Sequence, residues 1–195
     1  MANKEFSPQE SFLLINNMIA EARDRFVENG HIYVFWGAFI FLMSFSQYIL
    51  IRLDYGYISY FPYFLVPLGV LYSFYYYRKY RPTAGRSNQI SRLLTNIWIV
   101  ISVNMTTLGF FFFGLREENL IPVLLLLSGV GISISGVILK ERMLTFAGIL
   151  SNVLGLATFW MDLTIQPLMM ATAAIVSLLI PGLWLRKTHK VRNEI

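Results

Sequence analysis

Residues 121–139 read IPVLLLLSGVGISISGVIL and contain no charged side chain. Five more apolar runs of similar length complete a set of six, which we place at 31–51, 57–77, 93–113, 121–139, 143–161 and 167–185. A helix of about 20 residues crosses a hydrocarbon core of roughly 30 Å. The runs lack the alternation of strands and exceed the usual strand length. The sequence therefore predicts an all-α polytopic membrane protein with a six-helix transmembrane bundle over 31–186.

The overall composition agrees with a membrane class. Of the 195 residues, 56% are hydrophobic and 14% are charged, whereas soluble domains carry about 25% charged residues. The large apolar fraction also excludes an intrinsically disordered chain. Cysteine is absent, which excludes disulfides, a thiolate nucleophile and cysteine-ligated zinc or iron–sulfur sites.

The basic residues are distributed unevenly between the two ends of the predicted spans. Of the 16 Lys and Arg residues, 14 fall on the side that holds both termini, and only Arg52 and Arg116 fall on the other. Positive charge gathers in cytoplasmic loops, so we expect both termini in the cytoplasm and the chain in a bacterial inner membrane. The same rule accounts for a sequence pI of about 9.5 without a nucleic-acid partner. The 14 residues are Lys4, Arg23, Arg25, Arg78, Lys79, Arg81, Arg86, Arg92, Lys140, Arg142, Arg186, Lys187, Lys190 and Arg192. The last three belong to a short basic tail over 187–195.

The segment 1–30 is too polar to span a membrane and has the pattern of an amphipathic helix. Ser7-Pro8-Gln9-Glu10 is a capping box with proline at the first helical position. Phe12, Ile15 and Ile19 then fall on one face at helical spacing. We expect this helix to lie in the cytoplasmic membrane interface or to pack under the bundle, where it offers a surface to a membrane or cytoplasmic protein partner.

The six spans group into three tandem hairpins. Pro62, Pro122 and Pro167 each lie near the outer end of an even-numbered span, and a basic cluster follows each of them after a similar interval. This regularity fits a duplicated hairpin. It fits equally well the ordinary placement of proline in first turns and of Lys and Arg on the cytoplasmic side. The sequence leaves both explanations open.

Small residues recur four apart on the fourth and fifth spans. Gly129 and Ser133 form one such pair, and Ser151 and Gly155 form another. This spacing lets two helix backbones approach closely. We expect the contact to lie within one chain, because a six-helix bundle needs many such contacts of its own.

Polar side chains inside the predicted spans are few and uncharged. The candidates are Gln47 in the first span, Asn104 near the middle of the third and Asn152 near the middle of the fifth. Such residues either form interhelical hydrogen bonds or line a polar cavity. No Asp, Glu, Lys or Arg lies near a span centre, which argues against proton-driven transport.

Charged residues also gather at the predicted outer edge. They are either ordinary loop charges or the rim of a charged vestibule, and the pair Glu117-Glu118 is explained by its place just ahead of a helix N-terminus. The candidates for this outer charged cluster are Arg52, Asp54, Arg116, Glu117, Glu118 and Asp162.

Motifs of known chemistry are absent from the sequence. The chain has no Walker-type phosphate loop, no H-E-x-x-H helix and no G-x-S-x-G elbow. His31 and His189 both fall on the cytoplasmic side, where a solvated interfacial histidine is the simplest interpretation. The sequence therefore predicts no catalytic residues, no cofactor and no metal site.

One stretch carries a resemblance to known proteins. Between Glu21 and Ile51, the segments Ala22-Arg23, Asn29-Gly30-His31 and Trp36-Gly37 resemble those of small six-span bacterial inner-membrane proteins of the Bacteroidetes type, whose activity is uncharacterised. The resemblance implies a membrane location and supplies no activity, and no functional residue is carried over from it.

Three functional hypotheses follow. The first is a non-catalytic membrane protein that regulates or scaffolds partners. The second is a small transporter or lipid-handling protein in which Gln47, Asn104 and Asn152 line a path. The third, a membrane-embedded enzyme, would depend on the outer carboxylates and Arg116. Nothing in the sequence decides the oligomeric state.

Overall fold

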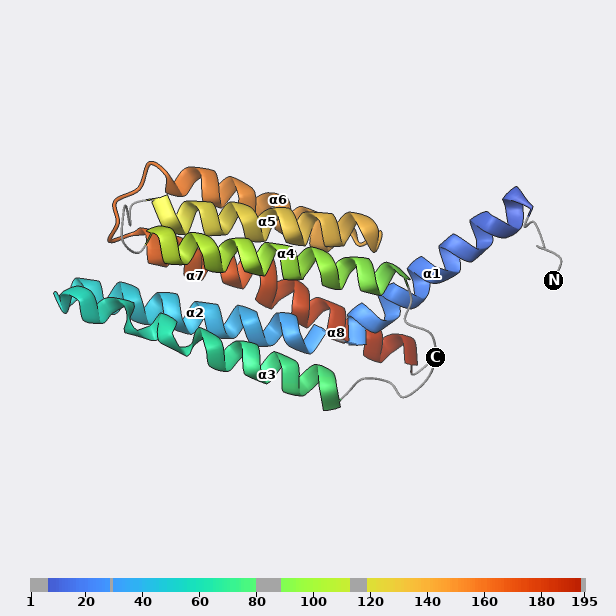
Figure 1. Ribbon diagram of the computed structural model, residues 1–195, viewed down its shortest axis with the longest axis horizontal. Coiled ribbons are helices and arrows are strands. Elements are labelled where there is room, and N and C mark those ends of the chain that lie inside the picture. The colour runs from blue at the N-terminus through green and yellow to red at the C-terminus, as the bar shows by residue number, and fades with distance from the viewer. Residues whose placement is uncertain (1–6, 29, 80–88, 113–118, 194–195) are drawn as a thin grey trace.

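A computed structural model describes residues 7–28, 30–79, 89–112 and 119–193 (Figure 1). Within these ranges the chain is helical apart from short turns and contains no strand, which confirms the all-α prediction. The elements are α1 (Pro8–Glu28), α2 (Gly30–Arg52), the 3-10 helix η1 (Gly56–Leu65), α3 (Val66–Lys79), α4 (Gln89–Phe112), α5 (Leu120–Ile138), α6 (Arg142–Thr158), α7 (Gln166–Ala174), the π-helical segment η3 (Ile175–Leu179) and α8 (Ile180–Asn193).

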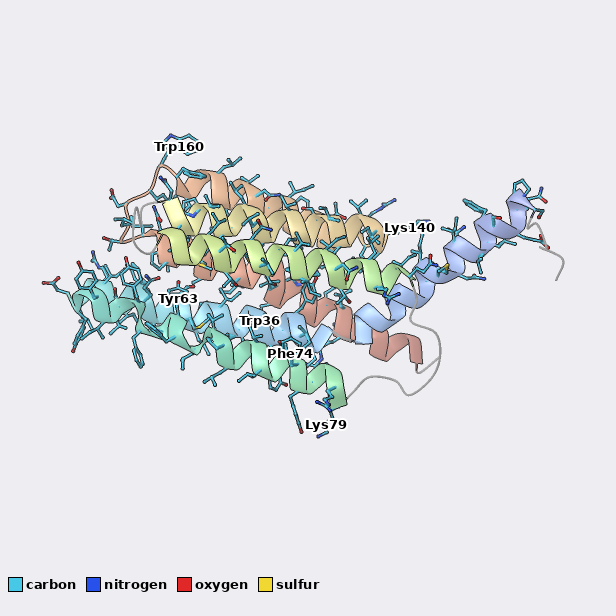
Figure 2. All side chains as sticks on the ribbon, in the orientation of Figure 1. Trp36, Tyr63, Phe74, Lys79, Lys140 and Trp160 are labelled. Carbon is cyan, nitrogen blue, oxygen red and sulfur yellow. The ribbon has the colours of Figure 1, made fainter. Side chains whose placement is uncertain are left out.

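The helices after α1 run lengthwise in an elongated bundle. In Figure 1, α2 and α3 lie on one side, α5 and α6 lie on the other, and α4 and α7 lie between them. Lys79 and Lys140 lie at one end of the bundle and Trp160 lies at the other (Figure 2). The end of α8 lies on the same side as Lys79 and Lys140, so the basic ends of the helices gather together as the charge distribution predicts.

Four helical segments among the described residues are long and apolar enough to cross a membrane: Gly30–Arg52, Gly56–Tyr76, Leu120–Ile138 and Gln166–Lys187. The expectation of six such spans is therefore met only in part. The helix α6 is apolar but has 17 residues, the lower limit for a span. The helix α4 has 24 residues and is not among the four.

The second span is not the single α-helix expected over 57–77. It begins as the 3-10 helix η1 and becomes α-helical only at Val66. Pro62 lies inside η1, and Pro67 follows in the first turn of α3. Proline has no N–H group, and its ring collides with the carbonyl four residues earlier in an α-helix. Two prolines five residues apart therefore explain why the chain winds differently here.

The last span contains the π-helical segment η3 between α7 and α8. The fully buried Pro181 lies two residues after the end of this segment. Its ring would collide with the carbonyl of Ser177 in a regular α-helix, and the wider turn of the π-helix relieves that collision. The helix α2 crosses this segment at Gly37, where an added Cβ atom would lie 2.7 Å from the backbone nitrogen of Leu179.

The most extensive contact between two elements joins α5 to α6. Gly129 and Gly136 of α5 face α6, and Gly148 of α6 faces α5. The two helices are so close that no Cβ atom fits at any of these three glycines. The prediction of close packing through small residues within one chain is confirmed. A turn with Lys140 in the left-handed region, at φ 55°, connects the two helices. The amide N–H of Glu141 donates to the Gly136 carbonyl at 2.8 Å, which is a Schellman cap.

The helix packing does not follow the three predicted hairpins. The closely packed helices α5 and α6 belong to different predicted hairpins. The helix α2 does contact η1 of its own hairpin, but its contacts with α7, η3 and α8 together are more extensive than those with η1 and α3. The reason is geometric: Gly37 and Gly182 let α2 and the last span approach closely. Trp98 of α4 and Ser135 of α5 are joined within the second hairpin by a 3.1 Å hydrogen bond from the indole N–H.

The N-terminal helix α1 begins at the predicted capping box. The Ser7 backbone N–H donates to Glu10 Oε2 at 2.9 Å, and the Glu10 backbone N–H donates to Ser7 Oγ at 3.2 Å. The helix contacts α2, α4 and α8, and Lys140 Nζ donates to Asn16 Oδ1 at 3.1 Å. From these contacts α1 extends beyond the end of the bundle (Figure 1). It therefore packs under the bundle only in part.

Candidate functional site

A polar cluster lies buried between α2, η1 and α7. Ser44 and Gln47 are three residues apart on α2, so they share one face, and both are fully buried. The phenol of Tyr63 in η1 donates to Gln47 Oε1 at 2.8 Å, and Ser44 Oγ lies 3.3 Å from the same phenol oxygen. Met170 Sδ of α7 lies 3.9 Å from that oxygen. Gln47 therefore makes the interhelical hydrogen bond that was one of the two alternatives for it.

A second polar cluster joins α2 to α3 nearer the basic end. A hydrogen bond of 2.7 Å connects His31 Nε2 with Tyr72 Oη, and the His31 ring stacks on Tyr76 at a centroid distance of 5.1 Å. The indole N–H of Trp36 donates to Ser73 Oγ at 3.0 Å. These contacts link two helices that otherwise touch little. They differ from the solvated interfacial role that the sequence suggested for His31.

Sequence reasoning missed Tyr63 and Tyr72 as members of these clusters. Tyrosines flanking a membrane span are typical of an aromatic belt at the headgroup level, and that was the interpretation available. The usable signal was the spacing of Tyr72 and Tyr76, which lie four residues apart and so face one neighbour. Both clusters consist of side chains that hydrogen-bond between helices, and each such bond in a membrane bundle contributes about 0.6–2 kcal/mol to stability.

The two candidate asparagines do not meet. Asn104 is exposed on α4, and its Nδ2 donates to the Val100 carbonyl of its own helix at 2.8 Å. Asn152 lies at the α5–α6 contact, where its Oδ1 occupies the space beside Gly129. That oxygen and Ser133 Oγ are buried without a hydrogen-bond partner in the described part of the chain. The two residues therefore lie in separate surroundings.

The outer charged cluster is described only in part, because Arg116, Glu117 and Glu118 lie outside the described residues. Arg52 and Asp54 lie at the end of α2, and Asp162 lies before α7. Asp54 has a φ of 58°, and its N–H donates to the Ile51 carbonyl at 3.0 Å, so it closes α2. The Asp162 carbonyl accepts the Ile165 N–H at 2.8 Å. The backbones of these two residues thus form turns at helix ends.

The described residues contain no group of three or more His, Asp or Glu side chains able to hold a metal ion. No protein-family model, curated protein or solved structure matches the chain.

Proposed function

We propose that the chain is a six-span, non-catalytic protein of a bacterial inner membrane that binds a partner protein at its cytoplasmic face through α1. The observation that carries the proposal is the consecutive apolar run Phe12-Leu13-Leu14-Ile15. Phe12 is 65% exposed and Ile15 is 53% exposed, on a helix that extends past the end of the bundle (Figure 1). A stable aqueous surface rarely leaves four adjacent large apolar side chains uncovered.

The six-span threading brings α1 to the cytoplasm. The helices α4 and α6 complete the six spans, because each lies lengthwise beside α5 (Figure 1) and α6 reaches the lower length limit for a span. Positive charge at the Lys79 and Lys140 end then favours a cytoplasmic location for that end. Because α1 leaves the bundle at this end, its apolar run lies on the cytoplasmic side.

A protein is a better occupant for the apolar run than the lipid surface. The helix leads away from the end of the bundle instead of turning along it (Figure 1). Its polar residues also carry both signs, with Glu21, Arg23 and Asp24 close together in sequence, whereas helices that bind anionic lipid are polybasic. An apolar helix face that fits into a groove is a common mode of protein recognition.

Photocrosslinking in intact cells tests this proposal. A photoreactive residue placed at Phe12 should give one discrete protein adduct, and one placed at the exposed polar Asn17 should not. The adduct at Phe12 should disappear when Ile15→Asn is added, while the amount of inserted protein stays the same. Adducts to phospholipid alone, or equal adducts at both positions, would overturn the proposal.

A further inference from the structure

An open groove flanks the turn between α5 and α6 at the basic end of the bundle. It has a volume of about 500 Å³, which lies within the range of ligand sites. Apolar and small side chains form most of it, and two cations are among the lining residues. The lining residues are Gly136, Val137, Lys140, Arg142, Thr145, Phe146 and Ile149.

The backbone geometry of the turn creates this groove. Gly136 packs directly on Thr145, so the two helices meet along this line. The side chains of Val137, Phe146 and Ile149 stay on the flank, where they are 64%, 68% and 51% exposed. A membrane protein keeps such an apolar flank against acyl chains, because lipid is the solvent at this level.

The cations of the groove have no acidic counterpart among the described residues. Neither Lys140 nor Arg142 lies within ion-pair distance of a described carboxylate, although Glu141 lies between them in sequence and reduces the local net charge to +1. Lys140 Nζ does contact Asn16 Oδ1, but that amide is neutral. An ammonium group has three protons, so Lys140 can donate to an anion as well as to Asn16.

We infer that this groove binds an anionic phospholipid of the cytoplasmic leaflet. The phosphate lies against Lys140 and Arg142, and one acyl chain follows Val137, Phe146 and Ile149 toward the membrane centre. Basic side chains above an apolar flank match a lipid that is charged at one end and apolar along the rest. Basic pockets beside membrane helices on this side recognise anionic headgroups for the same reason.

Binding of two lipids that differ only in charge tests the inference. The purified full-length chain in an uncharged detergent is titrated with phosphatidylglycerol or with phosphatidylcholine of identical acyl chains, and retained lipid is counted by native mass spectrometry. We expect tighter retention of phosphatidylglycerol. The double change Lys140→Asn with Arg142→Gln should weaken that retention about 30-fold, since each basic group near an anionic surface contributes roughly a fivefold factor. Asparagine is chosen because it tolerates the left-handed backbone at this position.

A matched pair of basic residues serves as the control. Arg78→Gln with Lys79→Gln removes the same charge at the same end of the bundle (Figure 2) and leaves the groove intact. Equal loss in both double variants would overturn the inference, because it would show a general charge effect. Equal retention of the two lipids by the unaltered chain, or full competition by inorganic phosphate, would overturn it as well.

A second variant tests the inference even if the charge variant does not fold. Phe146→Ser alters only an exposed flank residue, so the bundle should persist with its thermal midpoint unchanged. It should weaken retention of long-chain phosphatidylglycerol and leave a short-chain analogue unaffected. Equal weakening of both analogues, or no weakening of either, would show that no acyl chain lies along this flank.

Discussion

The phenol of Tyr63 in η1 donates a hydrogen bond of 2.8 Å to Oε1 of Gln47 in α2, and Gln47 is only 2% exposed. The bond links a 3-10 helix to the first span, and loss of the donor would leave the buried Gln47 oxygen without this partner. This pair, with Ser44 beside it, is a polar attachment between η1 and α2.

Removal of the phenol should therefore destabilise the bundle. Tyr63→Phe leaves Gln47 Oε1 buried without a donor and should lower the free energy of unfolding by about 1–2 kcal/mol. The double variant with Gln47→Met should be less destabilised than Tyr63→Phe alone, since the unpaired oxygen is gone. Unfolding in mixed micelles measures both, and Tyr57→Phe, at a position 88% exposed, is the control and should change nothing. A larger loss in the double variant would contradict this explanation.

The crossing of α2 and η3 should not tolerate a methyl group. Gly37→Ala places a Cβ atom 2.7 Å from the Leu179 backbone nitrogen, and such overpacking costs about 1–3 kcal/mol. Gly109→Ala in α4 is the matched control, because no atom of the described residues lies within 4 Å of the added carbon. That control should be neutral or stabilising by up to about 1 kcal/mol. Thermal midpoints that fall equally in both variants would refute the close crossing.

The left-handed residue at the end of α2 should prefer glycine. Asp54 has a φ of 58°, and a non-glycine residue in that region carries a strain of roughly 1 kcal/mol. Asp54→Gly should therefore raise the thermal midpoint, Asp54→Asn should leave it nearly unchanged, and the β-branched Asp54→Val should lower it. A stabilising valine would show that the turn is not left-handed in the folded protein.

The threading makes a separate prediction, which the absence of cysteine makes convenient to test. Single cysteines at Asp54 and Trp160 should react with a membrane-impermeant maleimide added to spheroplasts. Cysteines at Lys79 and Lys140 should react only after the membrane is opened, because those positions share the basic end of the bundle (Figure 2). Labelling of Lys79 and Lys140 from opposite sides would exclude the two spans expected between these positions.

The helical class and the tight contact of α5 with α6 were predictable because both depend on local pattern. A charge-free run over 121–139 and small residues such as Gly129 and Gly155 carry that information in the sequence itself. The pairing of α2 with the last span was not predictable. It depends on Gly37 meeting a π-helical segment far along the chain, and helical periodicity says nothing about which distant helix lies opposite.

For the candidate polar residues too, the sequence identified the residue but not its partner or surroundings. Gln47 was identifiable as a polar residue within an apolar run, but its partner Tyr63 is indistinguishable in sequence from a tyrosine at the headgroup level. The different surroundings of Asn104 and Asn152 follow from the rotation of each helix about its own axis, which neighbouring side chains determine. Composition alone could not show that Asn104 is exposed and that Asn152 lies at a helix contact.

The pairing of the first span with the last one determines the order in which the helices can pack during synthesis. Ribosomes deliver α2 to the bilayer early, yet its principal partner begins only at Gln166. Until then the Gly37 surface has only acyl chains for neighbours, whereas α5 and α6 can associate as soon as both have been inserted. The bundle can therefore close only when translation is nearly complete. A chain truncated before Gln166 has a first span, α2, without its native packing partner.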